Sequence, residues 1–439
     1  MTPPAAMPNA YVPGQGDLSD DDLALVARRT RALGPAYRLF YETPVHLVRG
    51  AGVWLYDRDG HAYLDAYNNV ASVGHCHPDV VAATARQSAI FASHTRYLHD
   101  AVLDYAEALI ATHAPELSNA MFTCSGSEAN DLAFRIARAH TGGTGFIVTE
   151  NAYHGVTFAI AGMSPSLGAG VDLGAHVRTI PAPDPQRLPG DPGAAFAASV
   201  QVAIDDMQRH GIRPAGLIVD TIFSSDGIFA DPPGFLAPAV AAIRAAGGVF
   251  IADEVQAGFG RTGDAMWGYQ RHGLIPDIVT MGKPMGNGYP VAGLVVQPGV
   301  LAAFGAKSRY FNTFGGNAVA AATAMAVLRV VQNEGLQANA HDVGGYFVQA
   351  LRDLAKSHSC IGDIRGAGLF IGVDVIADDP LTPDPAKTAR IVNGMRAARV
   401  LISSSGPRAN VLKIRPPLVF SRGDVDYFLD RFEGVLRAG

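Results

Sequence analysis

The order of short apolar runs and helical patterns in this chain predicts an α/β fold: a large domain with a mostly parallel sheet, and a smaller α/β domain. Six short runs are almost entirely apolar, at 120–123, 145–149, 216–219, 248–252, 278–281 and 293–296. Continuously apolar strands indicate burial on both faces, which is typical of parallel sheets covered by helices. A helical pattern lies between the first two runs, at 128–140, where apolar residues recur at helical spacing.

The N-terminal part predicts a tail, a capped helix and a small antiparallel element. Residues 1–17 are rich in proline, glycine and alanine, and we expect them to be mobile. Ser19 precedes three aspartates, which predicts a capped helix because acids are favourable at a helix start. The segments 45–49 and 53–64 roughly alternate apolar and polar residues, and Asp59-Gly60 supplies a hairpin turn.

The C-terminal third predicts the rest of the smaller domain. A helix is expected from about Gly315 to Gln332, and Asn333-Glu-Gly335 marks a boundary. Strands are expected beyond it at 366–375, 400–403 and 411–414. The expected limits are a tail at 1–17, a large domain at 77–325, and a small domain built from 18–76 and 326–439.

Composition narrows the classes of function. A net charge of −6 without a basic run argues against a nucleic-acid partner. Three cysteines are too few for a disulfide framework, which favours a reducing compartment. The start lacks the pattern of a signal peptide, and no apolar run is long enough to span a bilayer. We therefore expect a cytoplasmic enzyme without a membrane partner.

Lys283 stands in a glycine-rich turn directly after a short apolar strand. Burial among apolar neighbours lowers the pKa of a lysine, which frees its amine for Schiff-base chemistry. Asp253 ends another apolar strand 30 residues before Lys283, and an aspartate is the partner that a pyridinium nitrogen requires. This pair of residues indicates pyridoxal 5′-phosphate as the cofactor.

Two further segments fit the same cofactor. Ser125, Gly126 and Ser127 directly precede the helical pattern at 128–140, and backbone N–H groups at such a helix start form a phosphate cup. Tyr153 follows another apolar strand and offers an aromatic ring at the strand end. Phosphate cup, aromatic face, acid and lysine therefore occur in one chain.

Five motifs carry a resemblance to a known family. They are Ser125-Gly-Ser-Glu-Ala-Asn130, Tyr153-His-Gly155, Ala252-Asp-Glu-Val-Gln256, Gly282-Lys-Pro284 and Thr313-Phe-Gly-Gly-Asn317. From about Val45 to its C-terminus the chain resembles the class III aminotransferases, which belong to the fold type I pyridoxal-phosphate-dependent enzymes. The resemblance implies an aspartate-aminotransferase-like large domain.

The resemblance also implies a role for each site residue. The implied cofactor-binding residues are Ser125, Gly126, Ser127, Tyr153, His154, Asp220, Asp253, Val255, Gln256, Lys283 and Thr313. Lys283 would be the catalytic residue and carry the cofactor as a Schiff base, and Asp253 would pair with the ring nitrogen. Val255 and Tyr153 would pack the two ring faces, with Gln256 near the ring hydroxyl.

Two of these positions carry further implications. Asp220 stands where the family usually has a glutamate. Thr313 would reach the cofactor phosphate of the partner subunit, so the resemblance implies a homodimer with shared sites.

Three other motifs would suit different binding sites, but each departs from the pattern that such a site requires. Gly258 to Gly263 matches G-x-G-x-x-G, which would suit a dehydrogenase, but Asp253-Glu-Val-Gln256 separates it from the strand and a poor helix start follows. Gly282-Lys283 precedes proline rather than the serine or threonine of a P-loop. His75-Cys-His77 lacks a second ligand pair at metal-site spacing, so we expect a structural turn and no metal.

The reaction itself is indicated by finer resemblances. The segments 63–78, 95–100, 281–288, 361–366 and 410–417 are similar to phospho-lyases that act on O-phosphoethanolamine and 5-phosphohydroxylysine. Arg96 would suit a substrate phosphate because a guanidinium binds it with two hydrogen bonds; the alternative is a surface arginine. Tyr67 and Asn69 are the other expected substrate-binding residues. The first hypothesis is a phospho-lyase that releases phosphate and ammonia from a small phosphorylated amine.

The alternative is an aminotransferase that moves an amino group from a primary amine or ω-amino acid to a keto acid. Amine transaminases carry a mobile arginine on a C-terminal strand, and the segment 400–406 has serine at that place. Arg408 or Lys413 could substitute for it. Both hypotheses share the cofactor and Lys283.

Overall fold

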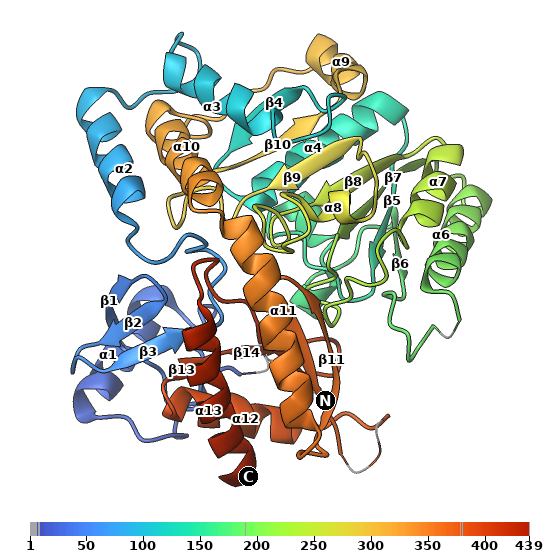
Figure 1. Cartoon of the computed structure of the whole chain (residues 1–439). Coiled ribbons are helices and arrows are strands. Elements are labelled where there is room, and N and C mark those ends of the chain that lie inside the picture. Colours follow the sequence, from blue (N-terminus) through green and yellow to red (C-terminus); the bar gives the residue numbers. More distant parts are fainter. Residues whose placement is uncertain (1–6, 8, 189, 378, 380, 439) are drawn as a thin grey trace.

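The computed structural model describes residues 7, 9–188, 190–377, 379 and 381–438, and within these residues the strands form three sheets (Figure 1). The strands of the largest sheet are β4 (Asn119–Thr123), β5 (Gly145–Thr149), β6 (Val177–Ile180), β7 (Pro214–Asp220), β8 (Val249–Asp253), β9 (Ile278–Met281) and β10 (Ala292–Val296). Their order is β4-β10-β9-β8-β7-β5-β6. β10 runs antiparallel to both neighbours, and the five strands from β9 to β6 are parallel.

Helices cover both faces of this sheet, which explains its continuously apolar strands. One face packs against α4 (Gly126–Thr141), α5 (Phe158–Ala161) and α9 (Pro298–Lys307). The other packs against α3 (Asp100–Ile110), α6 (Pro192–Arg209), α7 (Ala237–Ala245) and α10 (Ala318–Asn333). α8 (Gly268–Arg271) is a single short turn. The expected α/β class with a mostly parallel sheet is confirmed.

The smaller unit joins both ends of the chain. Its first sheet contains β1 (Leu47–Ala51), β2 (Trp54–Asp57), β3 (Ala62–Asp65) and β13 (Val400–Leu401). Its second contains β11 (Ile361–Ala367), β12 (Phe370–Val375), β14 (Ser403–Ser405) and β15 (Val411–Ile414). Its helices are α1 (Asp20–Leu33), α11 (Leu336–Ala355), α12 (Pro385–Ala397) and α13 (Arg422–Ala438), whereas α2 (Pro78–Ile90) packs against α10 of the large unit (Figure 1). One hydrophobic core includes Leu64, Val400 and Phe428, so the two termini fold together.

Three expectations for strands were wrong or incomplete. The segment 366–375 is not one strand, because a turn at Gly368 separates β11 from β12. Gly368 has a φ of +53°, and a Cβ there would lie 2.4 Å from the carbonyl oxygen of Arg261. The segment 400–403 is divided between two sheets as β13 and β14. The edge strand β6 was not predicted because its two central residues, Arg178 and Thr179, are polar.

The N-terminal region is partly tied to the fold. Residues 1–6 and 8 of the expected mobile tail lie outside the described residues. Asn9 is buried, and its carbonyl oxygen accepts a hydrogen bond from the Tyr41 N–H at 2.7 Å. Ser19 caps α1 as expected, since its Oγ accepts from the Asp22 N–H. The domain limits remain predictions, and the expected boundary at 325 falls inside α10.

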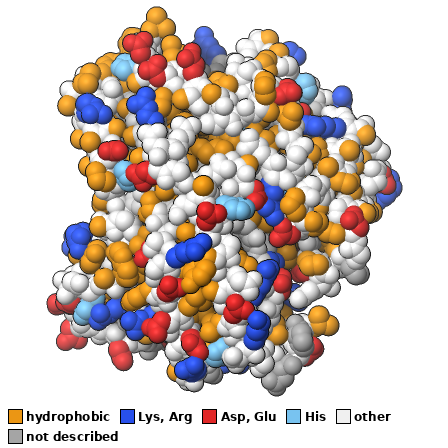
Figure 2. Space-filling model, viewed as in Figure 1, with side chains coloured by type: hydrophobic (Ala, Val, Ile, Leu, Met, Phe, Trp, Pro, Cys, Tyr) orange, Lys and Arg blue, Asp and Glu red, His pale blue; other side chains and the backbone are white. Residues whose placement is uncertain are grey.

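The surface agrees with the balanced composition. Figure 2 shows positive and negative side chains interspersed on the viewed face, without a field of one sign. Every helix among the described residues is too short or too polar to cross a lipid bilayer.

Candidate active site

The candidate residues lie where parallel strands end. Asp220 and Asp253 are the last residues of β7 and β8, and Lys283 follows β9 by two positions. Tyr153 follows β5, and the N-terminus of α4 follows β4. The carboxyl ends of parallel strands share one edge of a sheet, and ligands of α/β proteins bind at that edge. The fold therefore brings these separated motifs together.

Asp253 is buried and held by three donors. Its Oδ2 accepts hydrogen bonds from His154 Nδ1 at 2.7 Å and from Asn130 Nδ2 at 2.9 Å, and its Oδ1 accepts from the Val255 N–H at 3.1 Å. The Asn130 amide is itself fixed, because its Oδ1 accepts from Thr280 Oγ1 at 2.6 Å. Such donors stabilise an ionised carboxylate. Asn130 was not predicted as a site residue, although it ends the 125–130 motif.

Lys283 lies in surroundings that disfavour its charge. Burial lowers the pKa of Lys283 to about 8, and the positive charge of Arg415 acts in the same direction; Asp253 and Asp220 oppose it. The Nζ atom lies 5.9 Å from the centroid of the Tyr153 ring. An amine with this pKa is partly neutral near neutral pH and can act as a nucleophile or base.

The start of α4 is a tightly packed turn. Ser125 is the N-cap, and its Oγ accepts from the Glu128 N–H. A Cβ on Gly126 would lie 2.9 Å from the Val255 side chain, and a Cβ on Gly155 would lie 2.5 Å from Ser127 Oγ. Only glycine permits these approaches, which bring Val255 and Gly155 close to the N-terminus of α4, the end of a helix that favours anions.

Asp220 lies beside Asp253 in the sheet, as the two residues are paired in register. Burial raises the pKa of Asp220, and the charge of Asp253 raises it further. The N–H groups of Ile222 and Ser224 donate to its carboxylate at 3.2 and 3.0 Å. Asp220 thus holds the turn after β7.

Gln256 connects this turn to the C-terminal sheet. Its Nε2 donates to Ser224 Oγ, and its Oε1 accepts from the guanidinium of Arg415. The Arg415 guanidinium carbon lies 4.4 Å from the centroid of the Tyr67 ring. Sequence reasoning missed Arg415, and it named Lys413 only as a substitute for the mobile arginine. The available signal was two cations, two residues apart, within an otherwise apolar run.

The remaining predicted residues lie in different surroundings. Asn69 is buried, and its Nδ2 has no hydrogen-bond partner among the described residues. Arg96 is exposed, with its guanidinium carbon 3.7 Å from the centroid of the Phe311 ring. Thr313 is also exposed, two residues beyond Phe311. The segments of Arg96 and Thr313 therefore adjoin on the surface of the single chain.

The motifs at 258–263 and 75–77, which would suit other binding sites, make structural contacts. No helix begins directly at the glycines of 258–263 in the described chain, since α8 starts only at Gly268. The guanidinium of Arg261, within that motif, donates to two backbone carbonyl oxygens. His75 binds Asp65 at 2.7 Å, whereas His77 binds Glu334 at 3.0 Å, so the two imidazoles serve different contacts.

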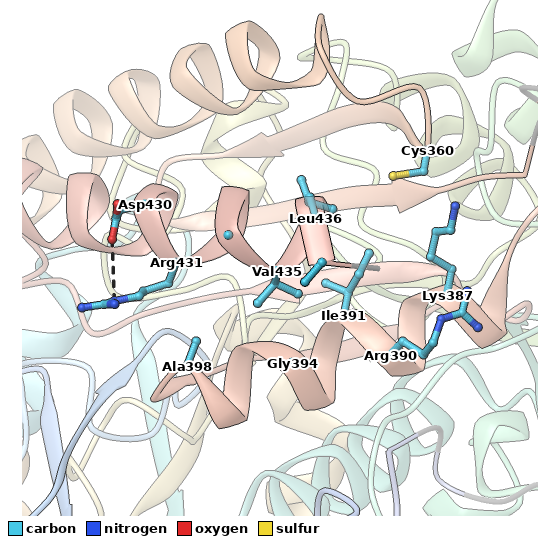
Figure 3. A pocket seen from close by; sticks show the side chains of 12 residues that line it. Cys360, Lys387, Arg390, Ile391, Gly394, Ala398, Asp430, Arg431, Val435 and Leu436 are labelled. Carbon is cyan, nitrogen blue, oxygen red and sulfur yellow. Dashed lines mark ion pairs between the residues drawn. The ribbon is translucent and has the colours of Figure 1, made fainter.

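A cavity of about 640 Å³ lies elsewhere, between α12 and α13 of the smaller unit (Figure 3). Cys360, Ile391 and Val435 line it, and Arg431 pairs with Asp430 at 3.7 Å. None of the residues gathered at the strand ends lines this cavity. It therefore has no part in the chemistry described above.

Comparison with known proteins matches nearly the whole chain to one family and to several of its members. The family described as aminotransferase class-III matches residues 40–436. The Drosophila melanogaster protein named alanine–glyoxylate aminotransferase 2-like is 41% identical over 425 residues, covering 93% of this chain and 86% of that protein. Ethanolamine-phosphate phospho-lyase homolog 1 of Caenorhabditis elegans is 36% identical over 423 residues, covering 91% of this chain and 90% of that protein. A solved phospholyase from Arthrobacter, in complex with phosphoethanolamine, has a TM-score of 0.91 and 44% identity, covering 94% of this chain and 100% of that chain.

Proposed function

The chain belongs to the class III aminotransferase family of pyridoxal-phosphate-dependent enzymes, and on that premise we propose that it is a phospho-lyase. Its substrate would be a small phosphorylated amine such as O-phosphoethanolamine, from which it eliminates phosphate and ammonia. The observation that carries this proposal is the similarity, over 94% of the chain, to the solved phospholyase in complex with phosphoethanolamine. The transaminase alternative has support from the relative named as an aminotransferase.

The residues at the strand ends fit the cofactor. When bound, pyridoxal phosphate supplies an electron sink for the carbanion formed at the amine-bearing carbon. Asp253, oriented by His154 and Asn130, would hold the positive charge of the ring nitrogen. The remaining cofactor-binding residues of the proposal are Ser125, Gly126, Ser127, Tyr153, Asp220, Val255 and Gln256, with Thr313 from the partner subunit.

Lys283 would act as the base of the elimination. Its neutral amine takes the proton from the amine-bearing carbon, and phosphate leaves the neighbouring carbon with the electron pair of the C–O bond. The carbon that lost the phosphate then takes up a proton, and water replaces the amino group, which leaves acetaldehyde and ammonia when the substrate is O-phosphoethanolamine. The pKa of about 8 places this amine near the range where a base works at neutral pH.

A homodimer is part of the proposal. Leu98, Phe158 and Phe314 are 97%, 99% and 71% exposed in the single chain, and apolar side chains so placed favour a protein interface. Arg96 and Thr313 belong to the same exposed segments. A second copy packed here would cover these side chains and place Thr313 against the partner's cofactor.

The test is to incubate the holoenzyme with O-phosphoethanolamine, without any keto acid, and to measure inorganic phosphate and acetaldehyde. A phospho-lyase releases both in equal amounts. Amino transfer from a simple amine to pyruvate or glyoxylate, without phosphate release from O-phosphoethanolamine, would establish the transaminase instead.

A further inference from the structure

The backbone forms two overlapping turns around Lys283. The N–H of Met285 donates to the carbonyl oxygen of Gly282 at 2.8 Å. The N–H of Asn287 donates to the carbonyl oxygen of Pro284 at 3.2 Å. Because the first turn contains Lys283 and the second begins at the next residue, these hydrogen bonds hold Asn287 at a defined place relative to the lysine.

The side chain of Asn287 binds the backbone of a distant segment. Its Oδ1 accepts from the Val73 N–H at 3.1 Å, and its Nδ2 donates to the carbonyl oxygen of Gly74 at 2.8 Å. Its φ is +49°, in the left-handed region that asparagine adopts more readily than most residues. Since one planar amide makes both hydrogen bonds, the two segments are held in one relative arrangement.

Residues 66–74 form a loop directly after β3. We call it the substrate loop, because it contains the expected substrate residues Tyr67 and Asn69. Its two ends are joined, since Asp65 Oδ2 binds His75 Nε2 at 2.7 Å. Asp65 Oδ1 also accepts from the Tyr67 N–H at 3.1 Å. The base of the loop is therefore fixed beside β3.

The substrate loop contains buried polar groups without partners. Asn69 and Ser72 are 2% and 1% exposed, yet Asn69 Nδ2 and Ser72 Oγ have no hydrogen-bond partner among the described residues. An unsatisfied buried polar group costs free energy, so it favours conformations in which it reaches water. The loop therefore needs contacts from other segments to keep these groups in place, and the two hydrogen bonds from Asn287 are such contacts.

We propose that Asn287 is a positioning residue that sets the arrangement of the substrate loop relative to Lys283. This inference rests on the proposed function. The base of the elimination stands on one side of the two hydrogen bonds, and Tyr67 and Asn69 belong to the loop on the other side. A substrate must be held in a defined place while Lys283 takes its proton, and a small displacement lowers the rate strongly. Asn287 acts through the loop rather than on the substrate itself.

The experiment uses the full chain and removes the amide in two ways. Asn287→Gly loses both hydrogen bonds and keeps the positive φ without strain, whereas Asn287→Ala loses them and adds strain at that φ. Phosphate release from O-phosphoethanolamine gives KM and kcat, and titration with pyridoxal phosphate gives the cofactor affinity.

Asn393→Ala is the matched control. The Asn393 Oδ1 also binds a distant backbone group, the Glu42 N–H at 2.9 Å. It joins α12 to the segment before β1, and neither of these carries a site residue. The control therefore removes a contact of the same kind away from Lys283.

We expect both Asn287 variants to lower kcat/KM by roughly 10- to 100-fold, the effect of a misplaced substrate group. The cofactor affinity and the absorbance that borohydride abolishes should stay close to those of the wild type, because the turns around Lys283 keep their own backbone hydrogen bonds. Asn393→Ala should leave kcat/KM unchanged.

A double-mutant cycle tests whether Asn287 acts through the loop. Once Asn69→Ala has removed an expected substrate group, Asn287→Gly should lower kcat/KM by a much smaller factor than it does alone, since substitutions that affect one contact are not additive. A residue that only stabilises the fold would give the same factor in both backgrounds.

Four outcomes would overturn the inference. They are an unchanged kcat/KM in both Asn287 variants, a loss confined to Asn287→Ala, full additivity with Asn69→Ala, and failure of both Asn287 variants to fold or to bind the cofactor. Failure of the proposed function is seen separately, as absence of phosphate release by the wild type. The same variants are then compared in amino transfer from a simple amine, where an unchanged kcat/KM would again contradict the role of Asn287.

Discussion

The side chains around Lys283 set its chemistry through charge and burial. Arg415 acts against protonation, whereas Asp253 and Asp220 act for it, and burial is the largest effect, so the pKa falls to about 8 and part of the amine is neutral near neutral pH. Tyr153 offers a ring on one side at 5.9 Å. These surroundings fit the two roles proposed for Lys283, the nucleophile that binds the cofactor and the base that moves a proton.

Replacing Lys283 by alanine removes both roles. We expect turnover of O-phosphoethanolamine to fall by about 10³-fold or more, because the base that takes the proton is removed. The purified variant should also lose the cofactor absorbance that borohydride abolishes in the wild type. Persistence of full activity would show that the assignment of Lys283 is wrong.

The lowered pKa of Lys283 predicts how the apoprotein reacts with pyridoxal phosphate. Only the neutral amine attacks the aldehyde, so the rate should rise with pH and level off above the pKa. We expect the midpoint near 8 rather than near the usual 10.5. Stopped-flow measurement of cofactor uptake between about pH 6 and about pH 11 covers both values. A rate still rising steeply at the upper limit would contradict the described burial.

The residues that act within one motif could be predicted from the sequence, and those that act across motifs could not. Lys283 and Asp253 stand directly at strand ends, and the structure places them at one edge of the sheet. Asn130 and Arg415 acquire their contacts only through folding, since Asn130 binds Asp253 and Arg415 binds Gln256 across 123 and 159 positions. Local patterns contain no information about such partners.

At the scale of elements, close packing determines which positions of a helix accept a larger side chain. α11 contains two consecutive glycines, of which Gly344 is buried and Gly345 is exposed. A Cβ on Gly344 would lie 2.1 Å from the carbonyl oxygen of Gly368, in the turn between β11 and β12, whereas a Cβ on Gly345 meets no atom within 4 Å. The helix can approach the turn only because Gly344 has no side chain.

This difference gives a paired prediction for thermal or denaturant unfolding. Gly344→Ala should lower the free energy of unfolding by about 1–3 kcal/mol, because the added methyl group forces backbone atoms apart. Gly345→Ala should raise it by about 0.5–1 kcal/mol, since alanine is favoured over glycine inside a helix. Equal effects of the two substitutions would mean that α11 does not pack on this turn.

The strand errors have the same physical origin as the residue errors. Because β5, β8 and β9 are buried on both faces, they are apolar runs in the sequence and could be predicted. The structure places all three close to their expected limits. The turn at Gly368 was not predicted, because it lies within an apolar stretch. The φ of +53° at this glycine results from the fold, and the presence of a glycine in the sequence does not predict it. β6 is an edge strand, so it can contain polar residues such as Arg178 and Thr179, and it does not form an apolar run.

At the scale of the whole molecule, the two ends of the chain fold onto each other next to the site. β3 pairs in parallel with β13 through Leu64 and Val400. Tyr67 follows β3, while Arg415 follows β15, and their side chains meet. The N- and C-terminal segments thus meet through this contact, and the charge of Arg415 acts from there on Lys283.

The proposed homodimer makes the final prediction. If Thr313 acts on the partner's cofactor, Lys283→Ala and Thr313→Asp affect different sites of a hybrid dimer. Thr313→Asp should weaken cofactor binding by roughly 10-fold or more, because a carboxylate repels the phosphate. Because Thr313 is exposed in the single chain, we expect its replacement to leave the fold of each subunit intact.

The two variants are coexpressed with different affinity tags, and hybrids are purified through both tags. One site of each hybrid has an intact Lys283 and an intact Thr313, so its activity should be about half that of the wild type, at a cofactor concentration that saturates only the wild type. If Thr313 acted within its own subunit, every site would carry one defect. The hybrid would then be no more active than a Thr313→Asp dimer, because subunit exchange can restore a site only when two subunits build it.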